Sequence, residues 1–368
     1  MPPAAGSSWH GAERVLAVRL DNIGDVLMLG PALRALRAAL PAAELTVLVS
    51  PAGRQAVPLL PWVDDVIVHR AVWQDASGAM PVDPARELDL VEELRRRRFD
   101  AAFIFTSFSQ SPWPPAYACY LAGIPFRAGQ SKEFGGSLLS TWVHAAPDAG
   151  HQVDRNLHLL DGAGVAGADS DLEAVLPDAA VRRAGALLEQ AGIDPRRPFV
   201  VAAPGASCGA RRYPPARFAA AVGQLRGRGL PVVVVGSERE AAVIEPVEVA
   251  ANASLVGGTT VVELAAVIAR AALVVCNNSG PLHLADAFRR PVVVLYSGTD
   301  HVTQWAPRSS PHRLLRRATG CSPCFGFECP YDLDCLHIGP GELVAACVEL
   351  LESVAEEVVA APCAPCAS

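Results

Sequence analysis

The sequence predicts an α/β protein made of two Rossmann-like domains with a cleft between them. Its 368 residues are too many for one ordinary domain and suit two of moderate size. The apolar residues fall in short continuous runs, which are typical of strands buried on both faces of a parallel sheet. These runs alternate with helical patterns, and the alternation favours right-handed βαβ units in an open, doubly wound sheet.

Strands and helices alternate in the first half of the chain. The predicted strands are Val15–Leu20, Leu45–Val49, Val66–Val68 and Ala101–Thr106. The predicted helices are Asp25–Leu40, a segment that begins near Gly53, and Ala85–Arg98. Pro31 lies inside the first helical pattern and predicts either a kink or a helix that begins at the proline. The aromatic stretch Ser107–Tyr120 is interpreted as a packed loop, with the lining of an acceptor groove as the alternative.

The second half repeats this rhythm. The predicted strands are Phe199–Ala203, Pro231–Val235, Leu273–Cys276 and Val292–Tyr296. The predicted helices are Ala179–Ala191, Pro215–Arg228, Glu238–Ala250, Thr260–Arg270, Pro281–Phe288 and Gly341–Val359. The stretch 162–178 is rich in Gly, Ala and Asp and is the predicted linker. We therefore expect domains at 1–170 and 178–340, followed by a C-terminal helix and tail at 341–368.

Composition excludes several classes of function. The formal net charge of −7 argues against nucleic-acid binding, which needs a basic surface. The N-terminus lacks the basic start and apolar run of a signal peptide. No stretch reaches the roughly 18 continuous apolar residues of a membrane span. We expect a cytoplasmic protein.

The first candidate motif follows the first predicted strand, where DNIGDVLMLG leads into a helix. This position puts Asp25 at the carboxyl edge of the sheet, where open α/β sheets bind ligands. Gly24 lets the backbone turn tightly before it. On this fragment alone, Asp25 is more simply a first-turn residue favoured by the helix dipole than a catalytic group. A carboxylate here would repel a phosphate, so the loop is not a phosphate site.

The second candidate motif is VCNNSGPLHLADAF, at residues 275–288. Ser279 can cap the helix that follows, Gly280 allows close backbone approach, and Pro281 presets the first turn. The free amides at this helix start form a good anion site, although an ordinary capped junction has much the same composition. His283 either faces the site or packs.

Two further loops carry charged residues next to predicted strands. Arg211 and Arg212 precede a helix, and guanidinium groups there suit a diphosphate, although a solvated basic loop is the plainer interpretation. Glu238 and Glu240 follow the strand that ends in VVVVG. An acid at such a position can accept hydrogen bonds from ribose hydroxyls, or it can be a helix N-terminal charge.

Together these motifs resemble the opening and donor-site signatures of glycosyltransferase family 9, the ADP-heptose:lipopolysaccharide heptosyltransferase family. The two stretches are RVLAVRLDNIGDVLMLGPALRALRAALP and NNSGPLHLADAFRRPVVVLYSGTD, in that order, and the likeness covers nearly the whole chain. The resemblance implies a GT-B fold, with two Rossmann-like domains facing across a cleft. It implies that the N-terminal domain binds the acceptor and the C-terminal domain binds an ADP-sugar.

The resemblance also implies roles for individual residues. Asp25 matches the family's catalytic base, and Arg211 stands where the family usually places a basic residue before an aromatic-proline pair. The expected substrate-binding residues are Gly24, Asn22, Arg212, Glu240, Asn278, Ser279, Gly280, Pro281, His283, Thr299 and Asp300. Asn278 replaces an acid that the family often carries, which removes a negative charge beside the diphosphate. Glu238 is the alternative to Glu240, and Gln130 is a further acceptor-contact candidate by position.

The implied reaction is inverting transfer of a heptose-type sugar from an ADP-sugar to a saccharide or lipid-linked saccharide in bacterial surface-glycan synthesis. No metal or cofactor is expected, because arginine and backbone amides can stabilise the leaving diphosphate. Contact with the inner face of the plasma membrane would be at most peripheral. The alternatives are a nucleotide-sugar epimerase or hydrolase on the same scaffold, which would need an acid pair flanking the sugar, and a non-catalytic nucleotide-sugar-binding subunit, which would not need Asp25.

Four of the ten cysteines cluster in CSPCFGFECPYDLDC. They are Cys321, Cys324, Cys329 and Cys335. A zinc ribbon has its two cysteine pairs about 15–20 residues apart, so this spacing fits a metal site poorly. We favour reduced structural thiols or a disulfide-stabilised loop over a metal site.

Overall fold

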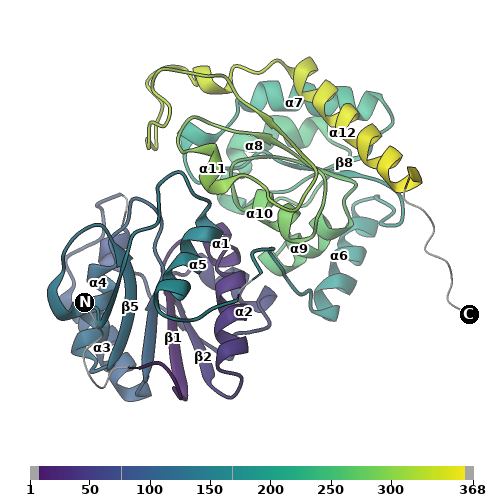
Figure 1. Cartoon of the computed structure of the whole chain (residues 1–368). Coiled ribbons are helices and arrows are strands. Elements are labelled where there is room, and N and C mark those ends of the chain that lie inside the picture. The colour runs from purple at the N-terminus through teal and green to yellow at the C-terminus, as the bar shows by residue number, and fades with distance from the viewer. Residues whose placement is uncertain (1–7, 76, 168, 361–368) are drawn as a thin grey trace, which may run out of the picture. The chain divides into compact units, whose positions relative to one another are not determined.

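The computed structural model describes residues 8–75, 77–167 and 169–360, and the chain divides into two compact units, Met1–Val175 and Leu176–Ser368. Each unit contains one six-stranded parallel sheet with helices on both faces (Figure 1). The prediction of an α/β protein with two Rossmann-like sheets is confirmed.

The two sheets have the same topology. The first runs β3-β2-β1-β4-β5-β6 and the second runs β12-β11-β10-β7-β8-β9, which is the doubly wound order 3-2-1-4-5-6 in both cases. The strands of the first sheet are β1 (Arg14–Arg19), β2 (Glu44–Val49), β3 (Asp65–Val68), β4 (Ala101–Ile104), β5 (Phe126–Ser131) and β6 (Thr141–His144). Those of the second are β7 (Val200–Ala203), β8 (Val232–Val234), β9 (Ala253–Ser254), β10 (Leu273–Asn277), β11 (Val292–Leu295) and β12 (His312–Leu315).

Helices cover both faces of the first sheet. They are α1 (Ile23–Leu27), α2 (Gly30–Ala39), α3 (Pro84–Arg97), α4 (Trp113–Leu121) and α5 (Gln152–Gly162). Leu16 and Val18 of β1 pack in one buried cluster with Leu94 of α3 and Cys119 of α4. Helices α2 and α5 lie on the opposite face (Figure 1). The alternate residues of β1 are therefore buried on each side, which explains why the strand is continuously apolar.

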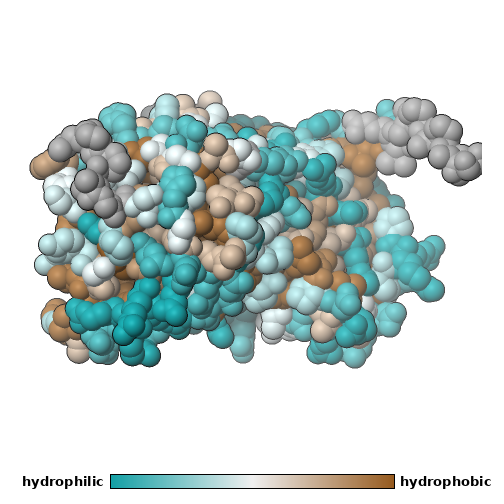
Figure 2. Space-filling view, turned by 60° about the horizontal axis from the view of Figure 1, so that its bottom comes forward, coloured by the Kyte–Doolittle hydropathy of each residue, from teal (hydrophilic) through white to brown (hydrophobic). Residues whose placement is uncertain are grey.

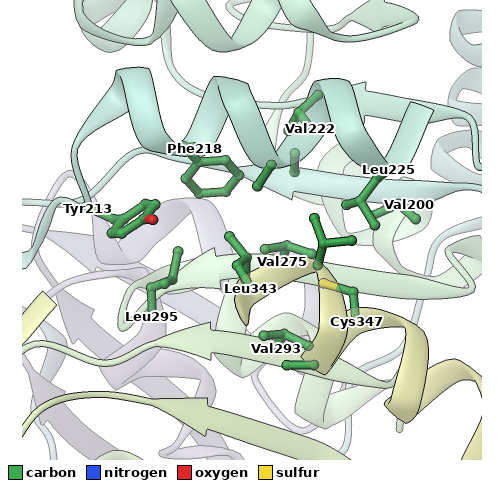
Figure 3. Close-up of a cluster of buried hydrophobic side chains, with 14 of the residues drawn as sticks. Val200, Tyr213, Phe218, Val222, Leu225, Val275, Val293, Leu295, Leu343 and Cys347 are labelled. Atoms are coloured by element: carbon green, nitrogen blue, oxygen red, sulfur yellow. The ribbon is translucent and has the colours of Figure 1, made fainter. Parts of the chain in front are cut away.

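The second sheet is covered in the same way. Its helices are α6 (Asp178–Gln190), α7 (Pro215–Gly227), α8 (Ala241–Ala250), α9 (Val261–Arg270), α10 (Gly280–Ala287), α11 (Val302–Trp305) and α12 (Pro340–Ala360). Figure 3 shows Phe218 and Val222 of α7 pointing toward the strands, with Leu343 and Cys347 of α12 in the same cluster. The long C-terminal helix is thus part of the core of the second unit.

Several elements were not predicted because their residues do not form continuous apolar runs. Strands β5 and β12 carry buried or half-buried arginine, glutamine and histidine, and β9 has only two residues. The stretch expected to be a loop at Ser107–Tyr120 contains helix α4, which begins at Trp113 with prolines in its first turn. Proline is tolerated there because the first amides of a helix have no intrahelical partner. Strand β6 and helix α5 were also not predicted.

The first helical pattern splits at its proline. Helix α1 ends at Leu27, and α2 begins at Gly30 with Pro31 in its first turn, so the interpretation of Pro31 as a helix start is confirmed. The segment near Gly53 is a 3₁₀ helix, η1 (Gly53–Leu59), with Pro58 inside it. Within the described part of the chain, no helix combines the length and apolar composition needed to cross a membrane.

This topology gives each unit a switch point, which is where open α/β sheets bind ligands. Strand order reverses between β1 and β4 in the first sheet and between β7 and β10 in the second. The loops that leave the carboxyl ends of such strands diverge to opposite faces, which opens a crevice at the switch point. The loops after these four strands are therefore where the candidate sites are expected.

Candidate functional site

Asp25 lies at the switch point of the first sheet, in the first turn of α1. Its Oδ2 accepts a hydrogen bond from the Asn22 backbone N–H (3.1 Å), which completes the cap of this short helix. Its Oδ1 accepts from Nη2 of Arg19 (2.9 Å) at the end of β1. The side chain is 14% exposed. Asp25 therefore caps a helix and also presents an ion-paired carboxylate at the sheet edge.

Arg19 belongs to a ring of polar contacts that joins the loops after β1 and β4. Its Nη2 donates to Ser107 Oγ (2.9 Å), and its Nε lies 3.0 Å from Oδ2 of Asp21. The Ser107 N–H donates to Gln110 Oε1 (3.0 Å), and Gln110 Nε2 donates to Asp21 Oδ1, which closes the ring. This ring was not predicted, because its members come from two chain segments more than eighty residues apart.

Asp21 is buried and carries a perturbed charge. Burial raises its pKa from 3.8 to about 6. Arg19 opposes this rise, while the neighbouring Asp25 charge adds to it and the Gln110 hydrogen bond lowers it. Such a group titrates close to physiological pH, which is a feature of functional sites.

A second buried guanidinium lies near this ring. Arg155 of α5 donates from Nε to the Thr106 carbonyl (3.1 Å) and packs over the Phe108 ring at 5.0 Å. Burial, together with the charge of Arg19, lowers the pKa of Arg155 to about 10. A second positive charge thus lies near Arg19.

The other first-unit candidates are placed less favourably. The side chain of Gln130 is buried; its amide donates to the Arg155 carbonyl (2.6 Å) and accepts from the Ala146 N–H (3.1 Å). It therefore serves the packing of α5 on the sheet, and its acceptor-contact role is wrong. Asn22 is exposed next to Asp25, and Gly24 is buried in α1.

The second candidate site lies where the loops after β7 and β10 meet. The side chain of Asn277, the last residue of β10, donates to the carbonyls of Pro204 (2.7 Å) and Gly205 (3.2 Å) and accepts from the Tyr213 N–H (3.1 Å). Ser279 is the N-cap residue of α10, and its hydroxyl lies 3.4 Å from the Gly205 carbonyl rather than capping the helix. The prediction that the Ser279 side chain caps α10 is wrong, because that hydroxyl contacts the neighbouring loop.

Arg211 reaches across the second site to the loop after β11. Its Nε donates to Thr299 Oγ1 (3.1 Å), and its Nη2 donates to Asp300 Oδ2 (2.7 Å). Ser297 bonds both Thr299 (3.0 Å) and Asn278 Oδ1 (3.1 Å). The predicted residues Arg211, Thr299, Asp300 and Asn278 are thus joined in one network through Ser297, which the sequence analysis missed.

Glu240 lies against the loop after β7. A Cβ added to Gly205 would lie 2.2 Å from Oε1 of Glu240, so only glycine permits this approach. The other oxygen, Oε2, accepts from the Ser237 N–H (3.0 Å) and hydroxyl (2.6 Å). Glu238 instead lies beside Gly257, so Glu240 is the acid that the fold brings to the β7 loop.

The remaining candidates of the second unit lie on helix α10 and in the loop after β7. Gly280 and Pro281 begin α10, which has no acidic residue in its first turn. His283 is buried on this helix. Arg212 turns away from Thr299 and donates to the Ala206 carbonyl of its own loop (3.2 Å).

The cysteine-rich loop packs directly on the second site. The N–H groups of Cys324 and Phe325 donate to the carbonyls of Gly298 (3.0 Å) and Thr299 (2.9 Å), and the Ala210 N–H donates to the Phe327 carbonyl (3.0 Å). The loop therefore holds both Ala210, the residue before Arg211, and Thr299, one of the two residues that Arg211 contacts.

The four cysteines of this loop are free thiols. Cys321 and Cys324 are exposed, Cys329 is half-buried and Cys335 is buried. The structure thus contradicts the disulfide alternative for this cluster. Across residues 8–75, 77–167 and 169–360, no group of three or more His, Cys, Asp or Glu side chains is arranged to hold a metal ion.

The charge of Asp21 gives a prediction about stability. Its folded pKa of about 6 lies above the unfolded value of 3.8, so its contribution to stability is present below pH 4 and is lost as the pH rises through 6. At about 1.4 kcal/mol per pKa unit, the ionised carboxyl costs on the order of 2 to 3 kcal/mol at pH 7.5. The amide of Asp21→Asn does not titrate, so the unfolding free energy of wild type, measured by urea unfolding relative to this variant, should fall by about 2 kcal/mol between pH 4.5 and pH 7.5. A difference between the two proteins that is the same at both pH values would contradict this expectation.

Comparison with known proteins agrees with this geometry. Residues 88–334, more than half of the chain, match glycosyltransferase family 9 (heptosyltransferase). Lipopolysaccharide heptosyltransferase 2 of Escherichia coli K12 is 28% identical over 320 residues, covering 83% of this chain and 89% of that protein.

Two solved structures show the same fold. E. coli ADP-heptose LPS heptosyltransferase II has a TM-score of 0.72 at 24% identity, covering 93% of this chain and 99% of that one. E. coli heptosyltransferase WaaC with ADP has a TM-score of 0.61 at 18% identity, covering 94% and 98%. The fold is therefore GT-B, and the chain belongs to glycosyltransferase family 9, the heptosyltransferase family.

Proposed function

We propose that this glycosyltransferase moves a heptose-type sugar from an ADP-sugar to a saccharide or lipid-linked saccharide acceptor of a bacterial surface glycan, with inversion at the anomeric carbon. The observation that carries the proposal is the different chemistry of the two switch points. The first presents a carboxylate, and the second presents a helix N-terminus and a guanidinium. The relatives' names, which include heptosyltransferase, ADP-heptose and lipopolysaccharide, support the choice of donor and acceptor.

The two units have separate roles in this proposal. The first unit would bind the acceptor, because a carboxylate at its switch point disfavours a phosphate and suits a hydroxyl. The second unit would bind the nucleotide sugar, because the free amides at the start of α10 favour an anion. Residues 1–170 and 178–340 would form these two domains, followed by the C-terminal helix and tail at 341–368, of which 361–368 lie outside the described residues.

Asp25 would be the general base. Once ionised, its carboxylate would accept the proton of the acceptor hydroxyl as that oxygen attacks the anomeric carbon. Arg19 donates to Oδ1 of this carboxylate, and the backbone N–H of Asn22 donates to Oδ2. The orientation of the carboxylate is therefore fixed. Asn22 and Gly24, on the same turn, would border the acceptor.

Arg211 would stabilise the leaving diphosphate. Its guanidinium is held by Thr299 and Asp300 at the end of the β11 loop, and it can bind phosphate oxygens in a bidentate way. The amides of Ser279 and Gly280 would add two donors at the start of α10, next to Pro281. These positive groups would replace a metal ion, so we propose metal-independent chemistry with no cofactor.

Glu240 would bind the ribose of the donor. Its carboxylate lies against Gly205 at the β7 loop, next to Ser279. An acid at the end of the second strand of a Rossmann-like sheet is in a position to accept hydrogen bonds from ribose hydroxyls. Asn278, His283 and Arg212 would complete the lining of this donor site.

Neither alternative function has a specific observation in its favour. The epimerase alternative needs two acids on opposite sides of a sugar. Asp21 is a second carboxylate near Asp25, but both lie against the same guanidinium and Asp21 is buried. The non-catalytic alternative gives no reason for a charged pair at the first switch point.

We also propose a cytoplasmic location with at most peripheral contact with the inner face of the plasma membrane. A lipid-linked acceptor would require such contact. Exposed aromatic side chains in the first unit, Tyr117, Tyr120, Phe134 and Trp142, support it, because aromatic rings favour the membrane interface. Figure 2 shows hydrophobic areas separated by hydrophilic residues on the face in view.

A screen of donors by calorimetry tests the substrate class. ADP-, GDP- and UDP-sugars are titrated into the purified enzyme under one set of conditions. ADP-heptose should bind most tightly. Equal or tighter binding of a UDP-sugar would contradict the proposed donor.

Asp25→Asn tests the catalytic base. The amide cannot accept the proton, so kcat should fall by about 10²–10⁴-fold while the Kd of the donor stays within about twofold. The matched control is Asp178→Asn, which removes an exposed first-turn carboxylate from α6 and should leave kcat unchanged. Near-normal turnover of Asp25→Asn would refute the assignment.

Arg211→Ala tests the electrostatic role of the guanidinium. Loss of one preorganised donor should cost roughly 2–4 kcal/mol of transition-state stabilisation, measured as the change in kcat/KM. Arg212→Ala is made in parallel, because Arg212 is the neighbouring guanidinium and donates to the Ala206 carbonyl of its own loop. An unchanged rate in Arg211→Ala with a loss in Arg212→Ala would move the role to Arg212.

A further inference from the structure

One guanidinium serves two carboxylates at the first switch point. Arg19 is fully buried, and its Nη2 contacts Asp25 at 2.9 Å while its Nε lies 3.0 Å from Asp21. Among the residues that the structure describes, Nε and Nη1 find no partner with hydrogen-bond geometry. The burial of this charge is therefore balanced by the two carboxylates rather than by a full set of hydrogen bonds.

We propose that Arg19 is the positioning residue for Asp25, and that the carboxylate of Asp21 divides the charge of Arg19 so that Asp25 remains an effective base. This inference rests on the proposed role of Asp25 as the general base. It goes beyond that role by assigning two residues that act through Asp25 without touching the substrate.

The geometry explains why Arg19 alone would not be enough. A guanidinium bonded to a single carboxylate holds it in place but also stabilises its ionised form, and this weakens it as a proton acceptor. Asp21 is a second anion on the same guanidinium and draws part of that attraction away. Because Asp21 is fixed by Gln110 through the Ser107 loop, its position does not depend on a ligand.

Asp21 is the second anion on the buried guanidinium of Arg19. An asparagine would fill the same space and could still bond Gln110, but it would leave Asp25 to balance the charge of Arg19 alone. The charged groups that face Asp21 are Arg19 from β1 and Asp25 from α1, and Arg155 of α5 lies close enough to Arg19 for their charges to interact. Gln110, which bonds Asp21 from the β4 loop, is neutral, as is Gln74, which bonds Gln110 (3.2 Å). The ionisation of Asp21 is thus set by this one cluster, and its pKa of about 6 lies within the range where transfer can be assayed.

The decisive test compares wild type with Asp21→Asn across pH 5 to 8.5. At pH 5 the wild-type carboxyl is mostly protonated and matches the amide in charge, so the two enzymes should have nearly equal kcat. Above pH 6.5 wild type should become faster by about tenfold, with the ratio of the two rates titrating near pH 6 and the KM for the donor unchanged. A ratio that is constant across this range, or equal to one throughout, would overturn the role of Asp21.

Arg19→Lys tests positioning without removing the charge. A lysine cannot span Asp25, Ser107 and Asp21 from one planar group, so kcat should fall by about tenfold or more with the donor Kd unchanged. The matched control is Arg127→Lys, because Arg127 is another buried arginine of the first unit and bonds only backbone carbonyls. It should lose stability but keep the wild-type kcat per folded molecule. Wild-type kcat in Arg19→Lys would overturn the role of Arg19.

Asp25→Asn, assayed alongside, separates this inference from the proposed function. If Asp25→Asn is inactive while Asp21→Asn and Arg19→Lys behave as wild type at every pH, the positioning pair is wrong and the base assignment stands. If Asp25→Asn is itself active, the assignment of Asp25 as the general base is contradicted, and the inference that rests on it is contradicted as well. Donor binding and thermal melting of every variant show that each one is folded.

Discussion

The strand order of the two sheets is the constraint on which both sites depend. Because every strand pair is parallel, all carboxyl ends of a sheet lie at one edge, and the order reverses once in each unit. In the first unit the reversal brings the loop with Asp25 to the loop with Ser107, and in the second it brings the loop with Ser279 to the loop with Gly205. The same architecture therefore builds two crevices, and the chemistry of each is decided by the few side chains that leave the strands there.

Those few side chains differ in how their charges are balanced. At the first switch point charged groups are buried against one another, and the pKa of Asp21 is set by its burial together with the charges of Arg19 and Asp25. At the second, the helix start of α10 supplies partial positive charge without a side chain, and Arg211 is held at the edge by Thr299 and Asp300. The first arrangement suits moving a proton, and the second suits holding a charged leaving group. The cysteine-rich loop supports the second arrangement only, through backbone bonds to Ala210 and Thr299.

The sequence predicted the elements whose signal is local. Continuous apolar runs located eight of the twelve strands, and Pro31 marked a helix start because its ring fits only the first turn. It missed β5 because Arg127 and Gln130 are polar, yet both are buried with their side chains bonded to backbone groups that no local pattern reveals. The sequence patterns placed Asp25, Ser279 and Arg211 directly after strands, but they could not show the hydrogen-bond partners of these side chains. The contact of Glu240 with Gly205 and that of Arg19 with Ser107 join residues far apart in the chain, and such contacts exist only after folding.

Arg19 shows most clearly why this part of the site is hidden in the sequence. A charged residue at the end of an apolar run normally marks the point where a strand leaves the core. A solvated arginine at the end of β1 would therefore give the same sequence pattern as the buried Arg19. In the folded chain the strand continues into the interior, so the guanidinium must find anions there or destabilise the protein. Asp21 and Asp25, two and six residues later, provide them because helix α1 begins at Ile23, directly after the end of the strand, with Asn22 as its N-cap residue. The spacing between Arg19, Asp21 and Asp25 is thus a consequence of the strand–turn–helix geometry, and the pairing that follows fixes the direction of the one carboxylate that remains partly open to solvent.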